Sequence, residues 1–123
     1  NHDFEFKDYD GTTGYDILLK ETDKNLVHFE LDLYWVVRAG KDPLQLFKEN
    51  SGRFTMWHVK DMDKENKDWN TEIGNGSIDF KTIFANAKLS GMKRFFVEQE
   101  TNYDPSPLGS IATSYNYVNK NLV

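Results

Sequence analysis

Residues 26–37 have the sequence LVHFELDLYWVV, which is the most apolar run of the chain. Aromatic and β-branched side chains dominate it, and apolar residues occur at odd positions, such as Phe29, Leu31 and Leu33, and at even positions, such as Leu26 and Val36. A strand that is apolar on both faces is typical of a parallel sheet covered on both sides. The run therefore predicts a buried parallel strand, with a carboxylate, Asp32, in its middle.

Strands and helices are predicted to alternate on either side of this run. Further strands are expected at residues 1–6, 53–59 and 94–98. Helices are expected at residues 13–22, 43–50, 78–90 and 108–122, where apolar residues recur at helical spacing. Asp42 and Pro43 are a typical helix start, Ser77 or Asp79 can cap the third helix, and Gly91 suits its end. Four successive βα units predict an α/β fold with a parallel sheet.

Four βα units are half the number in a (β/α)8 TIM barrel, which takes eight. Four parallel strands alone would leave two open sheet edges and an uncovered inner face. We therefore expect residues 1–123 to form a single-domain fragment, half of a barrel, completed by a missing half or by a second copy of the chain. A small open-sheet α/β domain is the alternative interpretation.

Composition excludes several classes of protein. The 123 residues carry a net charge of -5 without a basic stripe, which argues against a nucleic-acid surface. The chain has no cysteine, so a metal would need His, Asp, Glu or water as ligands. No apolar run is long enough to span a membrane. The compartment stays open between cytoplasm and periplasm.

Polar side chains cluster where the predicted strands end, which is where parallel α/β folds bind ligands. Asp32 is the clearest candidate, because an ionised carboxylate in an apolar strand is costly unless it is paired or binds a cation. His58 lies near the end of the predicted strand 53–59, and its alternative role is that of a hydrogen-bonded core histidine. Glu98 ends the predicted strand 94–98, and its alternative role is a salt bridge to Arg94 or Lys60. Carboxylates and an imidazole from neighbouring strands predict a divalent metal site.

The other polar segments have weaker indications. Glu30 shares a strand face with Asp32 and is expected in a structural ion pair, whereas His28 has no special context. The polar stretch 60–75 is long for a plain loop, which favours a functional loop, although residues 60–68 are expected to be mostly solvated. Gly74-Asn75-Gly76 is either a turn or a phosphate cradle before a helix.

Five segments together resemble a known family. In chain order, NHDFEF, LDLYWV, WHVKDMD, IGNGSIDFKTIF and FFVEQE are similar to the C-terminal half of sugar phosphate isomerase/epimerase proteins, which are xylose-isomerase-like TIM barrels. The resemblance covers essentially the whole chain. It implies the C-terminal half of a (β/α)8 barrel, one divalent metal ion (Mn, Mg, Zn or Co), and a sugar or sugar phosphate as the small-molecule partner.

The resemblance also implies roles for particular residues. Asp32, His58 and Glu98 match the metal ligands of the last three barrel strands, and Glu98 also matches the catalytic acid/base. The fourth ligand would lie at or before the start of the chain, where the family motif is HNHD, although His2 or Glu5 could contribute. Lys60, Gln99 and Trp35 are expected to contact substrate. Trp57 is a second candidate for stacking on a sugar, although core packing is the favoured alternative for both tryptophans.

The implied reaction is proton transfer next to a carbonyl through an enediolate, with metal assistance, and the fragment alone is expected to be inactive. One departure counts against a simple ketose epimerase: the second histidine that epimerases carry after the acidic ligand is replaced by Leu33-Tyr34-Trp35. A metal-dependent dehydratase or lyase and a non-catalytic carbohydrate-binding domain remain alternatives. A nuclease of the endonuclease IV type is disfavoured, because it needs more histidines.

Overall fold

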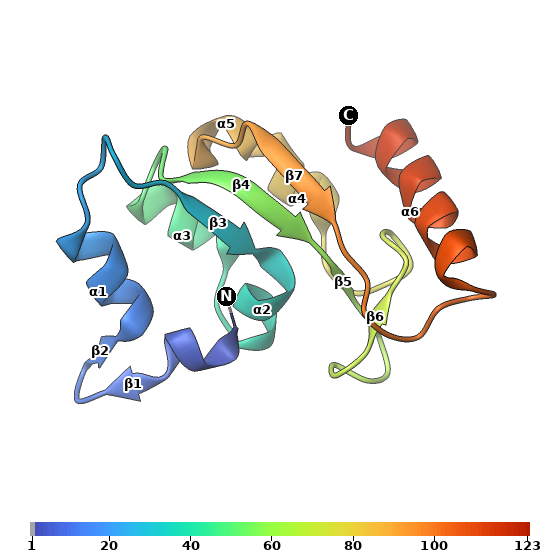
Figure 1. The fold of residues 1–123 in the computed structure, drawn as a ribbon, viewed down its shortest axis with the longest axis horizontal. Coiled ribbons are helices and arrows are strands. Elements are labelled where there is room, and N and C mark those ends of the chain that lie inside the picture. Colours follow the sequence, from blue (N-terminus) through green and yellow to red (C-terminus); the bar gives the residue numbers. More distant parts are fainter. Residues whose placement is uncertain (1) are drawn as a thin grey trace.

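A computed structural model describes residues 2–123, and a parallel sheet of three strands lies at its centre (Figure 1). The strands are β3 (Phe29–Asp32), β4 (Phe54–Val59) and β7 (Arg94–Val97), in the order β3-β4-β7. Asp32 lies beside His58, and His58 beside Phe96. Because side chains alternate between the faces of a strand, residues of one such row share a face of the sheet.

The helices are α1 (Gly14–Glu21), α2 (Leu33–Arg38), α3 (Pro43–Glu49), α4 (Phe80–Ala85), α5 (Ala87–Ser90) and α6 (Pro107–Asn121). In Figure 1, α3, α4 and α5 lie along one face of the sheet, whereas α1 and α6 stand at opposite ends of the molecule. The predicted helix starts are confirmed: Asp42 accepts a hydrogen bond from Leu44 N, and Asp79 from Thr82 N. Gly91 ends α5 with φ 85°, which glycine adopts without a steric cost.

The α/β class with a parallel sheet is confirmed, but the first predicted strand is wrong. Residues Asp3–Phe6 form a short 3-10 helix, η1, and a two-stranded antiparallel ribbon of β1 (Asp8–Tyr9) and β2 (Thr12–Thr13) follows it. Within η1 the backbone bonds are local, from Glu5 N to His2 O and from Lys7 N to Phe4 O. Asn1, the start of the predicted strand, is outside the described residues. The sheet described in residues 2–123 therefore has three parallel strands, not four.

The central strand is also shorter than its apolar run predicts. Strand β3 ends at Asp32, and residues 33–38 form α2. The Asp32 Oδ1 atom accepts a hydrogen bond from Trp35 N at 3.2 Å, which is the N-cap interaction that starts a helix. Leu33 and Val36 remain fully buried in α2. Burial of Leu31 in β3 and of Leu33 and Val36 in α2 explains why apolar residues continue along the run although its backbone changes from strand to helix.

The polar stretch after β4 forms a hairpin. Strands β5 (Asp61–Met62) and β6 (Asn70–Thr71) pair antiparallel and form a separate two-stranded sheet. The stretch is therefore partly ordered by its own backbone pairing, and it follows β4 at the end where β3 and β7 also finish (Figure 1).

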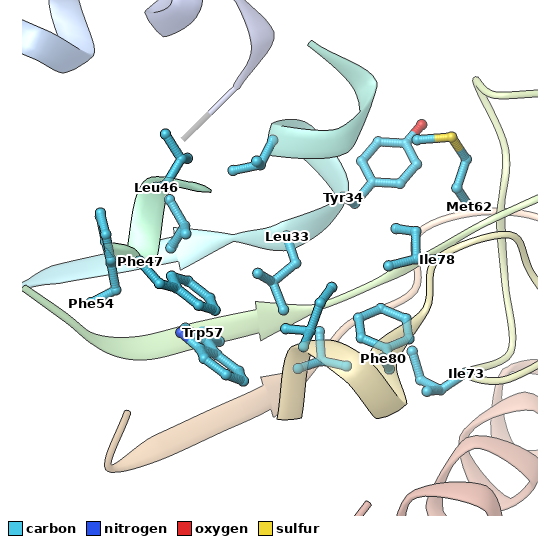
Figure 2. Close-up of a cluster of buried hydrophobic side chains, with 14 of the residues drawn as sticks. Leu33, Tyr34, Leu46, Phe47, Phe54, Trp57, Met62, Ile73, Ile78 and Phe80 are labelled. Atoms are coloured by element: carbon cyan, nitrogen blue, oxygen red, sulfur yellow. The ribbon is translucent and has the colours of Figure 1, made fainter. Parts of the chain in front are cut away.

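The hydrophobic core lies between one face of the sheet and the helices (Figure 2). The ring of Phe47 stacks on Trp57, with centroids 5.2 Å apart. The Trp57 indole N–H donates to Ser90 Oγ at 2.9 Å, and the Ser90 hydroxyl donates to Phe54 O at 2.8 Å. The opposite face is less covered: Phe96, in the row of Asp32 and His58, keeps 49% of its surface exposed.

Candidate metal centre

Three potential metal ligands lie together at the carboxyl ends of the three parallel strands. Asp32 is the last residue of β3, His58 is the next-to-last residue of β4, and Glu98 directly follows β7. Glu98 N donates to Val59 O at 3.0 Å, which holds Glu98 against β4 beyond the end of its own strand. One donor atom from each side chain lies within 4.8 Å of the other two, and this is the group that the described residues offer to a metal ion.

The spacing of these donor atoms fits a divalent cation. His58 Nδ1 lies 3.5 Å from Asp32 Oδ2 and 3.6 Å from Glu98 Oε2. With metal–ligand distances of about 2.0–2.2 Å, neighbouring donors around one ion are roughly 3–3.5 Å apart. One imidazole and two carboxylates also form a borderline donor set that suits Mn, Zn or Co as well as Mg. The triad that the sequence predicts is therefore brought together by the fold, and its role as a metal site remains a prediction.

Glu30 contacts the other nitrogen of the same histidine. Its Oε1 atom lies 3.3 Å from His58 Nε2, on the far side of the ring from Asp32 and Glu98. A metal-binding histidine usually has a carboxylate or carbonyl at its second nitrogen, which orients the ring and fixes its tautomer. The sequence did not identify His58 as the partner of Glu30. The shared strand face of Glu30 and Asp32 was a signal that could have placed Glu30 near the site.

Lys60 is buried against the triad. Its Nζ lies 3.0 Å from Glu98 Oε2, 3.3 Å from Glu100 Oε2 and 3.7 Å from Asp32 Oδ2. The Lys60 side chain is only 2% exposed. The pairing of Glu98 with Lys60, predicted as an alternative to metal binding, is therefore present. The predicted contact of Lys60 with substrate oxygens stays a prediction.

Burial and charge act in opposite directions on the ionisable groups of the site. Burial raises the pKa of Asp32, and Lys60, the Trp35 N–H and His58 oppose this rise only in part. Burial would lower the pKa of Lys60, but the Glu98, Asp32 and Glu100 carboxylates outweigh it and raise the pKa overall. Lys60 therefore carries its positive charge at neutral pH, directly beside the carboxylates.

The other predicted contact residues pack against the protein. The Gln99 amide nitrogen donates to Glu72 Oε1, Thr101 O and Asn102 O, so it organises the segment after β7. The Trp35 ring stacks on His2 at 4.8 Å, and the Arg38 guanidinium lies 5.5 Å from its centroid. Contact of Gln99 and Trp35 with substrate remains untested.

Burial and packing bear on two weaker predictions. Trp57 is fully buried in the core, which confirms core packing for this residue and excludes stacking of a sugar on its ring. His2, a possible fourth ligand, instead packs its ring on Trp35. Among residues 2–123 neither His2 nor Glu5 joins the group of Asp32, His58 and Glu98.

The glycine-rich segment before α4 binds a carboxylate of the same chain through its backbone N–H groups. Gly74 N and Gly76 N donate to Asp61 Oδ2 at 2.9 and 3.1 Å, and Ile78 N donates to Asp61 Oδ1 at 3.2 Å. The backbone donors that a phosphate would need are thus bound to an internal carboxylate, which favours the turn interpretation. Asp61 itself is fully buried, so the expectation that it belongs to a solvated loop is wrong.

Comparison with solved structures supports the half-barrel interpretation. No protein-family model and no curated protein matches the chain. Two crystal structures described as sugar phosphate isomerase/epimerase, both from Parabacteroides distasonis ATCC 8503, match it with TM-scores of 0.81 and 0.79 at 29% and 30% identity. The matches cover 98% and 96% of this chain but only 44% and 42% of those proteins.

The fold and the site define an α/β chain that corresponds to part of a TIM barrel, with its polar cluster at the carboxyl ends of the strands. The family-level resemblance predicted from sequence is confirmed: this chain is similar in structure and sequence to sugar phosphate isomerase/epimerase proteins and spans less than half of their length. No helix in the described part of the chain has the length and apolarity needed to cross a membrane.

Proposed function

We propose that this chain carries three metal ligands and one acid/base of a sugar or sugar phosphate isomerase/epimerase. The observation that supports the proposal most strongly is the convergence of Asp32, His58 and Glu98 at one end of the parallel sheet. The structural neighbours of about 30% identity bear the same enzyme name. The metal, the substrate contacts and the reaction are all part of this proposal.

The reaction requires a base beside a carbon that is adjacent to a carbonyl group. Glu98 is suited to this, because its side chain is 38% exposed and can reach a ligand, while the backbone bond from Glu98 N to Val59 O holds the residue against β4. Its carboxylate would take the proton, the electron pair of the C–H bond would move toward the carbonyl oxygen, and an enediolate would form. Return of a proton to the neighbouring carbon of the enediolate completes isomerisation. Return to the same carbon from its opposite face completes epimerisation.

A divalent ion held by Asp32, His58 and Glu98 would supply positive charge next to the oxygens on which negative charge develops. Before an ion binds, Lys60, 3.7 Å from Asp32 and 3.0 Å from Glu98, would keep both carboxylates oriented. Glu30 would orient His58 through the second ring nitrogen. We further propose that the second acid/base and the fourth ligand come from barrel strands outside this chain, so residues 1–123 alone would be inactive.

Deuterium exchange tests the reaction. The protein that carries this chain is incubated in D2O with Mn²⁺ and a panel of ketoses and their phosphates, and proton NMR follows loss of the signal at the carbon next to the carbonyl. Glu98→Gln should slow exchange by roughly 10²- to 10⁴-fold, the range for losing a general base. Glu65→Gln, which removes an exposed carboxylate of the hairpin, should not change the rate.

The same spectra separate the alternatives. Exchange with recovery of an isomer supports the isomerase/epimerase. Loss of substrate with elimination of water would support a dehydratase instead. Binding of a sugar without exchange, unchanged in Glu98→Gln, would contradict the proposal and indicate a carbohydrate-binding domain.

A further inference from the structure

Lys60 and a bound metal ion would need the same oxygen atoms. The ammonium contacts Asp32 Oδ2 and Glu98 Oε2. These are also the two carboxylate oxygens that face His58 Nδ1, the third donor of the candidate site. A buried ammonium is stable only when paired, and here its partners are two of the three metal ligands.

Repulsion between the two cations would be large in this position. A divalent ion between Asp32, His58 and Glu98 would lie a few ångströms from the Lys60 ammonium, in a region from which Lys60 is almost completely shielded from water. At such separations like charges repel strongly, because little water lies between them to weaken the field. Simultaneous contact of both cations with the same two oxygens is therefore unfavourable.

Glu100 offers the ammonium another position. Its Oε2 lies 3.3 Å from Lys60 Nζ, and its side chain is 58% exposed and lies outside the triad. The four-carbon stem of lysine is flexible and its ammonium donates in several directions. A small displacement would move Lys60 from the shared oxygens toward Glu100 while keeping it paired.

We propose that Lys60 is an exchangeable counter-ion of the metal site: it pairs with Asp32 and Glu98 when no metal is present, and yields their oxygens to an incoming divalent cation while remaining bound to Glu100. This inference rests on the proposed function, because it takes the triad as a metal site. It assigns Lys60 a positioning role, in place of the substrate contact expected from sequence, and gives a role to Glu100, which the sequence places only near the end of the last predicted strand.

A double-mutant cycle in Mn²⁺ affinity tests the exchange. Lys60→Met keeps the length of the side chain and removes the competing charge, so Mn²⁺ should bind at least tenfold more tightly by isothermal titration calorimetry. Glu100→Gln should weaken binding at least threefold in the wild-type background, because the displaced ammonium loses its partner. In the Lys60→Met background Glu100→Gln should change affinity by less than 1.5-fold. Lys64→Met, in the same hairpin but exposed, is the control and should match the wild type.

The outcomes distinguish this inference from the proposed function. Unchanged or weaker Mn²⁺ binding in Lys60→Met, with normal binding by the wild type, would overturn the counter-ion role and leave the metal site intact. An equal effect of Glu100→Gln on Mn²⁺ affinity in the wild type and in Lys60→Met would also overturn it. Glu100 would then act on the metal ion through its negative charge alone, without Lys60. Absence of Mn²⁺ binding in every variant would overturn both proposals together.

A second measurement does not depend on the folding of Lys60→Met. In the wild type, the Lys60 side-chain ammonium resonance should shift during titration with diamagnetic Zn²⁺, along the same saturation curve as the His58 ring signals. Lys60→Arg identifies the resonance by its disappearance. A His58 shift without any change at Lys60 would contradict the exchange.

Discussion

Glu72 is the residue at which the hairpin, the segment after β7 and α6 meet. Its Oε1 accepts hydrogen bonds from the Ser110 hydroxyl at 2.5 Å and from Gln99 Nε2 and Asp104 N at 3.3 Å each. Its Oε2 accepts from the Thr71 hydroxyl at 3.0 Å. Burial would raise the pKa of Glu72, but hydrogen bonds from Ser110, its own backbone N–H, Gln99 and Thr71 outweigh it and lower the pKa to about 2.

This shift predicts a pH dependence of folding stability. The pKa is lower in the folded chain than its ordinary value of 4.5, so Glu72 stabilises the fold above that pH and loses this contribution as pH falls from 4.5 toward 2. Glu72→Gln should therefore flatten the fall in the free energy of unfolding over this range, measured by urea denaturation. Glu65→Gln, in an exposed position, should keep the wild-type profile. Identical profiles for the two variants would contradict the assignment.

Ser110 gives a separate test of the same contact. Ser110→Ala leaves the buried carboxylate without its shortest hydrogen bond and should cost about 1.5–3 kcal/mol at pH 7, the range for a hydrogen bond to a charged group. Ser106, which caps the same helix but does not contact Glu72, provides the comparison. Ser106→Ala should lower stability by about 1 kcal/mol without altering the pH dependence between 4.5 and 2.

At the scale of elements, the connection from β6 to α4 is organised around Asp61. Its carboxylate accepts backbone hydrogen bonds from Gly74, Gly76 and Ile78. The chain passes so close that a Cβ on Gly76 would overlap Asp61 Oδ1 and Met62 O. Glycine is required at Gly76 by lack of space, and not by a left-handed backbone.

Gly76→Ala should therefore destabilise the fold by about 1–3 kcal/mol, the usual cost of forcing extra volume into a packed position. Gly14 is the matched control, because a Cβ there would meet only Glu5 O at an ordinary 3.8 Å. Gly14→Ala should change stability by no more than about 0.5 kcal/mol. Chemical denaturation of both variants measures the difference, and equal stabilities would show that the loop can move away from Asp61.

At the scale of the whole molecule, the outer side of β7 is unpaired within residues 2–123. Beside it, Phe95, Val97, Ile111, Tyr115 and Val118 line an apolar cavity of about 260 Å³ between β7 and α6. An open strand edge next to exposed apolar side chains favours association with further strands. In the longer neighbours more than half of the chain lies outside the matched part, and we propose that additional barrel strands cover this edge.

Residues 1–123 alone should accordingly self-associate, giving a mass above 14.4 kDa in light scattering at micromolar concentration. Ile111→Lys, which places a charge in the cavity, should shift the chain toward the monomer. Leu108→Lys changes an exposed leucine of α6 outside the cavity and should leave association unchanged. A monomer of 14.4 kDa at all concentrations would contradict this role of the open edge and of the cavity beside it.

The sequence alone predicted the α/β class, the helix start at Asp42, Asp79 as one of two possible caps of a later helix, and the members of the candidate site. These depend on local properties: alternation of apolar residues, caps that act within one turn, and polar residues placed directly after buried strands. Asp32, His58 and Glu98 could be grouped by their places at the ends of apolar runs, because parallel strands end at the same edge of a sheet.

Tertiary structure decided where strands end, which segments pair and which side chains meet. Buried strands and buried helices are equally apolar, so the apolar pattern does not separate them. Residues that pair in the fold are also distant in sequence. The run 26–37 changes from strand to helix at Asp32, where a cap hydrogen bond, invisible in the apolar pattern, ends the strand. Residues 2–6 alternate like a strand but form η1, with local backbone hydrogen bonds in place of strand pairing. Likewise, only the folded chain brings the Lys60 ammonium onto the oxygens of Asp32 and Glu98, since those contacts join three separate strand ends.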